Sequence, residues 1–127
     1  MCKKSFVGAF LILFIVSALQ AQQQKLDSLK NLLDNTKDVS SLADIHIEIA
    51  NLLYDEDAKV GFEESNLAYQ LAKSVGYKKG EKKSLSFIGF KYFLDGDHAK
   101  ALNYFRQSDK HGKQQKKRNL QPPKSQS

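Results

Sequence analysis

The 127-residue chain contains one cysteine, two prolines and no tryptophan. A single cysteine cannot form a disulfide within the chain, and a chain this short has room for one small domain. Both prolines lie in the last six residues, so none interrupts a helix in the body of the chain. No stretch alternates apolar and polar residues as a half-buried strand does. Because 41% of the residues are hydrophobic, we expect a folded, all-α protein.

Residues 1–21 have the pattern of a secretory signal peptide. Lys3 and Lys4 precede an almost unbroken apolar run over residues 6–19, whereas a membrane-spanning helix needs about 20 residues. We expect cleavage after Ala21, which removes Cys2 and leaves an exported chain, periplasmic or extracellular, with no thiol and no stable membrane span. An uncleaved anchor helix is the alternative.

The formal net charge of +6 comes from the two ends of the chain. Residues 1–21 carry +2, residues 22–108 carry −1 and residues 109–127 carry +5. A nucleic-acid-binding domain places its excess positive charge on a folded face, so no nucleic-acid partner is expected. Residues 111–127 have almost no apolar side chains and are predicted to form a disordered basic tail. The alternative is a basic tail that acts as an adaptor for an anionic surface.

The first half of the body reads as three helices. In residues 22–39, leucines three or four positions apart share one face, which predicts a leading amphipathic helix. Ser41 and Asp44 have the spacing of a capping box and start a second helix. Asp57 is expected to cap a third helix, which Gly76 ends.

The second half of the body reads as another pair of helices. The segment Tyr77–Gly80 is expected to form a turn, and an apolar-rich helix is expected over residues 82–94. The segment Asp95–Asp97 breaks that helix, and Asp97 is expected to cap the last one.

Small and apolar residues recur in the two helix pairs after 39 or 40 positions. The corresponding pairs are Ile49 and Ile88, Ala50 and Gly89, Leu53 and Tyr92, and Gly61 and Ala101. Small residues allow two helix axes to approach closely, and helical units repeated at this period indicate a solenoid.

Residues 82–110 contain Leu85-x2-Ile88-Gly89-x2-Tyr92 followed by Ala101-x3-Phe105. This motif resembles the tetratricopeptide repeat family, whose pattern is W-x2-L-G-x2-Y, then A-x3-F, then P. A leucine replaces the tryptophan and the closing proline is missing, while residues 40–76 match as a degenerate copy. The resemblance implies a short helical-hairpin solenoid, similar to the N-terminal part of exported bacterial signalling proteins of this family. A plain four-helix bundle is the alternative.

The resemblance also implies a concave face, lined by the first helix of each pair, that binds an extended or helical segment of a partner protein. The positions expected on this face are Asp44, Ile47, Asn51, Tyr54, Lys83, Ser86, Phe90 and Phe93. Aromatic side chains usually dominate the energy of such contacts, so Phe90 and Phe93 are the leading candidates. Packing of both rings against a following helix is the alternative.

Solenoids usually contain at least three repeats and a polar capping helix. This chain has a leading helix, two repeats and no evident cap, so we expect self-association through the open end, or marginal stability. We therefore expect the chain to be an exported module for protein–protein interaction. The alternative is a truncated sensory fragment of a membrane-associated two-component or transcriptional signalling protein.

No pattern in the sequence predicts catalysis, a metal site or a cofactor. His46, His98 and His111 lie in different segments and share no ligand spacing. The acidic run Asp55–Asp57 has no second ligand cluster, and Asp95–Asp97 lacks the further acidic residues of a calcium-binding loop. We therefore expect no enzyme activity.

Overall fold

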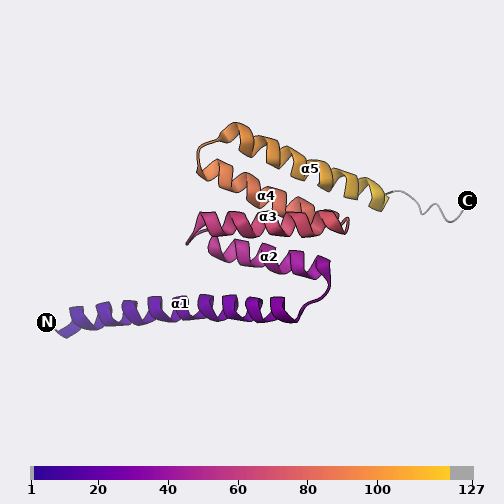
Figure 1. Cartoon of the computed structure of the whole chain (residues 1–127). Coiled ribbons are helices and arrows are strands. Elements are labelled where there is room, and N and C mark those ends of the chain that lie inside the picture. The colour runs from indigo at the N-terminus through magenta and orange to yellow at the C-terminus, as the bar shows by residue number, and fades with distance from the viewer. Residues whose placement is uncertain (1, 121–127) are drawn as a thin grey trace, which may run out of the picture.

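The computed structural model describes residues 2–120, and its regular structure is helical throughout this range (Figure 1). The five helices are α1 (Cys2–Asn35), α2 (Val39–Leu53), α3 (Ala58–Ser74), α4 (Lys78–Leu94) and α5 (His98–Leu120). No strand occurs between residues 2 and 120. The all-α prediction is therefore confirmed.

The helices α2 to α5 form two antiparallel hairpins that stack on each other, as Figure 1 shows. The first hairpin joins α2 to α3, the second joins α4 to α5, and α3 packs against α4 between them. The helix α2 also reaches α4, whereas α1 contacts α2 alone among the described helices. The first helix of each hairpin therefore lies beside the first helix of the other.

Short turns end and restart the helices where the sequence contains acidic residues and glycine. The Asp57 carboxylate accepts hydrogen bonds from the main-chain N–H groups of Lys59 and Val60, and so caps α3 as predicted. Gly76 and Gly96 follow α3 and α4 with φ of 67° and 81°, a left-handed conformation that favours glycine at helix ends. The cap of α2 is Asp38, not Ser41, because the Asp38 side chain accepts from the Ser41 N–H.

The interior of the two hairpins consists of small and aliphatic side chains together with the ring of Tyr54. The residues of this core with at most 6% of their surface exposed are Ala43, Ile45, Ile47, Ile49, Ala50, Tyr54, Ala68, Ala72, Leu85, Ile88 and Ala101. A methyl group built on Gly61 would lie 2.8 Å from the Tyr54 ring, and one built on Gly89 would lie 2.9 Å from the Phe105 ring. Each hairpin thus closes over a glycine that touches an aromatic ring.

The helix α4 begins earlier than the sequence predicts. Tyr77–Gly80 was expected to be a turn, but α4 starts at Lys78 and includes Gly80. A methyl group on Gly80 would lie 2.5 Å from the Tyr77 ring and 3.0 Å from the Ala72 Cβ. Close packing of α4 on α3 at this glycine outweighs its poor helix propensity.

The helix α5 extends further than the sequence predicts. Residues 111–120 were expected to belong to a disordered tail, but they continue α5, while residues 121–127 lie outside the described range. The His111 Nε2 atom lies 3.5 Å from a carboxylate oxygen of Glu81 on α4. The following residues are mainly lysine, glutamine and arginine, which favour helix, and the first proline is Pro122.

The helix α1 continues without a break through Ala21, the last residue of the expected signal peptide. Its segment Phe6–Asn35 is long and apolar enough to cross a membrane, by length and composition, and its most apolar part is not buried against the hairpins. A signal sequence near the N-terminus has the same properties. The N-terminal helix is thus compatible with either a signal peptide or a membrane span.

Candidate functional site: a groove between the hairpins

A groove opens where the first helices of the two hairpins lie side by side. Its volume is about 380 Å³, and we call it the α2–α4 groove. Its lining residues are Asn51, Tyr54, Asp55, Ser86, Phe87, Phe90 and Phe105. The polar residues Asn51 and Asp55 are exposed at its edge, and the aromatic residues form most of its wall.

Tyr54 forms the floor of the α2–α4 groove and joins the two hairpins. Its hydroxyl donates a hydrogen bond to the main-chain carbonyl oxygen of Phe87 at 2.6 Å. Its ring stacks on the Phe87 ring at a centroid distance of 5.7 Å and meets the edge of Phe90 at 5.6 Å. Burial raises the pKa of the Tyr54 hydroxyl, so this donor stays protonated at neutral pH. The groove therefore has a fixed floor rather than a free tyrosine side chain.

The opposite wall of the groove is fixed by hydrogen bonds between α4 and α5. The Oγ atoms of Ser86 and Ser108 lie 2.8 Å apart, within hydrogen-bond distance. The Ser108 hydroxyl also donates to the main-chain carbonyl oxygen of Lys82 at 2.9 Å. These contacts hold α5 against α4 and place the Phe105 ring at the end of the groove.

The structure brings four of the predicted concave-face residues together and separates the others. Asn51, Tyr54, Ser86 and Phe90 line the α2–α4 groove. Tyr54 was expected to point outward but is 6% exposed, because α4 covers it. It can shape the groove, but it offers little surface to a partner.

The remaining predicted positions lie elsewhere. Ile47 was also expected to face outward and is buried in the core. The Asp44 carboxylate accepts a hydrogen bond from the Tyr77 hydroxyl at 3.0 Å, and therefore links α2 to the start of α4. Lys83 is exposed outside the groove lining, and Phe93 lines a different hollow with His98.

Three groove residues were not predicted as partner contacts, namely Asp55, Phe87 and Phe105. Phe105 was assigned to packing within the second repeat, yet 36% of its surface is exposed and its ring closes the groove. Phe87 follows Ser86 along α4 and was not among the positions expected on the concave face. Its carbonyl oxygen and ring meet Tyr54 because α2 and α4 approach closely.

The residues predicted to pack the repeats mostly lie in the interior. Ile49, Ala50, Leu85, Ile88, Gly89 and Ala101 are buried. Leu53 and Tyr92 are half-buried, at the edges of the hairpins. The Tyr92 ring stacks on Tyr104 at 5.3 Å and meets the edge of Phe62 at 5.9 Å, so it bridges α3, α4 and α5.

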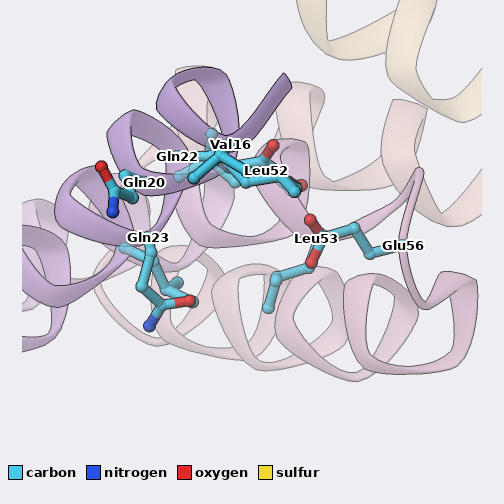
Figure 2. Close-up of a pocket in the computed structure, with 9 residues that line it drawn as sticks. Val16, Gln20, Gln22, Gln23, Leu52, Leu53 and Glu56 are labelled. Atoms are coloured by element: carbon cyan, nitrogen blue, oxygen red, sulfur yellow. Dashed lines mark hydrogen bonds between the residues drawn. The ribbon is translucent and has the colours of Figure 1, made fainter. Parts of the chain in front are cut away.

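A second hollow of about 320 Å³ lies between α1 and α2 (Figure 2). It is lined by Val16, Leu19, Gln20, Gln22, Gln23, Leu26, Leu52, Leu53 and Glu56. The Gln22 Nε2 atom donates to the main-chain carbonyl oxygen of Leu52 at 3.2 Å. Cleavage after Ala21 would remove Val16 and Leu19 from this wall, so the hollow depends on the intact N-terminal segment.

Two acid–base pairs are partly buried, one between two helices and one within α4. The His46 Nδ1 atom lies 2.5 Å from a Glu64 carboxylate oxygen and joins α2 to α3. The Glu81 carboxylate is 3% exposed and lies 3.1 Å from the Lys78 Nζ atom. Within residues whose side chains are described, no three His, Cys, Asp or Glu side chains gather as metal ligands would. The first pair is therefore interpreted as a contact between α2 and α3, and the second as a contact within α4.

Comparisons of the chain with family models, curated proteins and solved structures find no match in any of the three.

Proposed function

We propose that the chain is a protein-interaction module whose α2–α4 groove binds an apolar side chain from a segment of a partner protein. The observation that carries this proposal is the composition of the groove. Phe87, Phe90 and Phe105 supply an apolar wall, and Tyr54 supplies a floor held in place by its hydrogen bond to Phe87. A preformed aromatic pocket is the usual anchor of a binding hot spot.

The edge of the groove indicates which kind of segment it takes. Asp55 presents an exposed carboxylate, while Asn51 presents an amide that can donate or accept hydrogen bonds. A carboxylate beside an apolar pocket favours a cation at the neighbouring position of the ligand. The partner segment therefore carries an aliphatic or aromatic residue next to a lysine or arginine.

We also propose that the two hairpins are a short solenoid of the tetratricopeptide type. Small residues occupy buried positions in both hairpins: Ala50 and Gly61 in the first, Gly89 and Ala101 in the second. Layered stacking of hairpins supports the same proposal (Figure 1). In such an array the first helix of each hairpin lines the binding face, which agrees with a groove between α2 and α4.

The proposed cellular form is an exported chain that begins at Gln22. A membrane-anchored fragment of a signalling protein is the second candidate, favoured by the unbroken and exposed helix α1. The mass of the protein recovered from the producing cells separates the two. An N-terminus at Gln22 is expected, and a product that retains residues 1–21 in the membrane fraction would establish the anchored form instead.

Site-specific photo-crosslinking tests the binding proposal. A photoreactive amino acid replaces Asn51, at the groove edge, in the complete chain produced in its own cells. The crosslinked peptides are then sequenced by mass spectrometry. We expect one recurring partner segment with an apolar residue beside a lysine or arginine.

Two matched variants make this test specific. Phe90→Ala, which removes a groove wall, should strongly reduce the crosslink. Phe93→Ala, on the same helix but outside the groove lining, should leave it unchanged. Crosslinks scattered over unrelated sequences, or an equal yield from both variants with the fold intact, would refute the proposal.

A further inference from the structure

The second hairpin leaves an apolar surface open at the end of the stack. The exposed fractions of Phe93, Leu94 and Leu102 are 51%, 50% and 49%. A hollow of about 290 Å³ lies among Phe93, His98, Ala101, Leu102 and Phe105. In Figure 1, α5 is the outermost helix of the stack on this side. We call this surface the α4–α5 end.

The first hairpin shows what kind of structure covers such a surface. Phe93 and Leu102 correspond to Tyr54 and Phe62 in the repeat, 39 and 40 positions earlier. Tyr54 is 6% exposed because α4 covers it, and the Phe62 ring meets Tyr92 of α4 at 5.9 Å. The equivalent surface within the chain is thus covered by a helix of the next layer. A helix from another molecule fits the α4–α5 end in the same way.

The charge distribution indicates which helix of another molecule covers the α4–α5 end. Residues 77–120 contain 12 basic and 4 acidic residues, a net charge of +8. Residues 22–35 and the helix α2 together contain 2 basic and 4 acidic residues, a net charge of −2. Two α4–α5 ends facing each other across a two-fold axis would bring two strongly basic halves together, which like-charge repulsion opposes. An acidic N-terminal layer placed against the basic end is favoured instead.

We propose that the α4–α5 end binds the N-terminal layer of a second copy of this chain, head to tail. That layer comprises residues 22–35 of α1 and the helix α2 beneath them. Leu32 lies on α1 with 51% of its surface exposed and supplies an apolar contact for Phe93 and Leu102. Because such an interface uses two different surfaces, each added copy exposes both again, and the association forms rings or open chains.

Cysteine crosslinking in the complete chain tests this arrangement. With Cys2→Ser as background, one tagged copy carries Leu32→Cys and a second, differently tagged copy carries Leu102→Cys. Both are produced in the same cells and treated with a short bis-maleimide. We expect the mixed Leu32→Cys with Leu102→Cys product to exceed the Leu102→Cys homodimer several-fold, and to decline as salt is raised.

Matched controls decide between outcomes. Leu67 on α3 is 41% exposed, so Leu67→Cys paired with Leu102→Cys gives the background of random encounters. Leu102→Asp in the copy that carries Leu32→Cys leaves the N-terminal layer of that copy intact. Leu102→Asp in the other copy, which then carries Phe93→Cys as its crosslinking site, should abolish the mixed product. A dominant Leu102→Cys homodimer would establish a two-fold dimer instead. A mixed product no stronger than the Leu67→Cys background, with both thiols reactive to maleimide, would overturn the proposal.

Discussion

The Tyr54 hydroxyl lies 2.6 Å from the main-chain carbonyl oxygen of Phe87 and donates a hydrogen bond to it. This contact joins the residue that caps the end of α2 in the first hairpin to α4 in the second. The same tyrosine ring packs against Gly61 of α3, where a methyl group would lie 2.8 Å from it. One side chain therefore joins three helices and forms the floor of the α2–α4 groove.

Tyr54→Phe removes this hydrogen bond and keeps the ring. We expect the free energy of unfolding to fall by about 1 kcal/mol, the usual net value of one buried hydrogen bond. Tyr54→Ala also opens a cavity and should cost about 3–5 kcal/mol, as for other large aromatic truncations. Chemical denaturation followed by circular dichroism measures both. If Tyr54→Phe is as stable as the wild type, the bond between hairpins does not contribute to stability.

The stability of the protein should fall at alkaline pH in a way that depends on Tyr54. Burial raises the pKa of this hydroxyl, so the folded state favours the neutral form. The resulting stability is fully present below the unfolded pKa of about 10 and is lost as pH rises through the folded pKa. Melting temperatures from pH 8 upward should therefore decline less steeply in Tyr54→Phe than in the wild type. Parallel curves for the two proteins would contradict this expectation.

The cap of α3 can be tested against a neighbouring carboxylate. Asp57 accepts hydrogen bonds from the Lys59 and Val60 N–H groups, so Asp57→Ala should lower the free energy of unfolding by about 1 kcal/mol. Asp55 is an exposed groove residue two positions earlier, and Asp55→Ala should leave stability nearly unchanged. Equal losses in the two variants would mean that general negative charge, not capping, stabilises the start of α3.

Much of the fold could be predicted because its signals are local. Asp57 at the start of α3 and the glycines after α3 and α4 act within a few residues, so their sequence context was sufficient. The buried positions of Ala50, Gly89 and Ala101 followed from a repeat that a single sequence shows. The position of Tyr54 could not be read in this way, because its burial depends on α4, more than 30 residues later.

The same limit explains the two helix boundaries that the sequence placed wrongly. Gly80 looked like a turn residue, but its lack of a side chain lets α4 pack on Ala72. The residues after Lys110 looked disordered by composition, yet His111 reaches Glu81 across the hairpin. Phe90 and Phe93 were both expected on the concave face, but Phe90 lines the α2–α4 groove and Phe93 lines the hollow beside His98.

Shortening the chain tests the extended helix α5. A chain that ends at Lys110 loses the contact between His111 and the buried Glu81 carboxylate, together with the half-buried Gly112. We expect its free energy of unfolding to fall by about 1–2 kcal/mol, within the range for loss of a partner to a buried polar group. A chain that ends at Leu120 serves as the control and should match the full length. No loss on ending at Lys110 would indicate that residues 111–120 act as a solvated tail.

Each hairpin closes over a glycine in contact with an aromatic ring. Alanine normally stabilises a helix interior relative to glycine by roughly 0.5–1 kcal/mol, whereas this close packing predicts an effect of opposite sign at Gly61 and Gly89. A methyl group there would lie 2.8 Å from Tyr54 and 2.9 Å from Phe105. At Gly112 it would meet only the flexible end of Lys82, which can move aside.

The most direct measurement compares the free energies of unfolding of Gly61→Ala, Gly89→Ala and Gly112→Ala. We expect losses of about 1–3 kcal/mol for the first two, as overpacked interiors show, and no loss for the third. Equal or increased stability in all three variants would contradict this, because the helices of each hairpin would then have room that this packing does not allow.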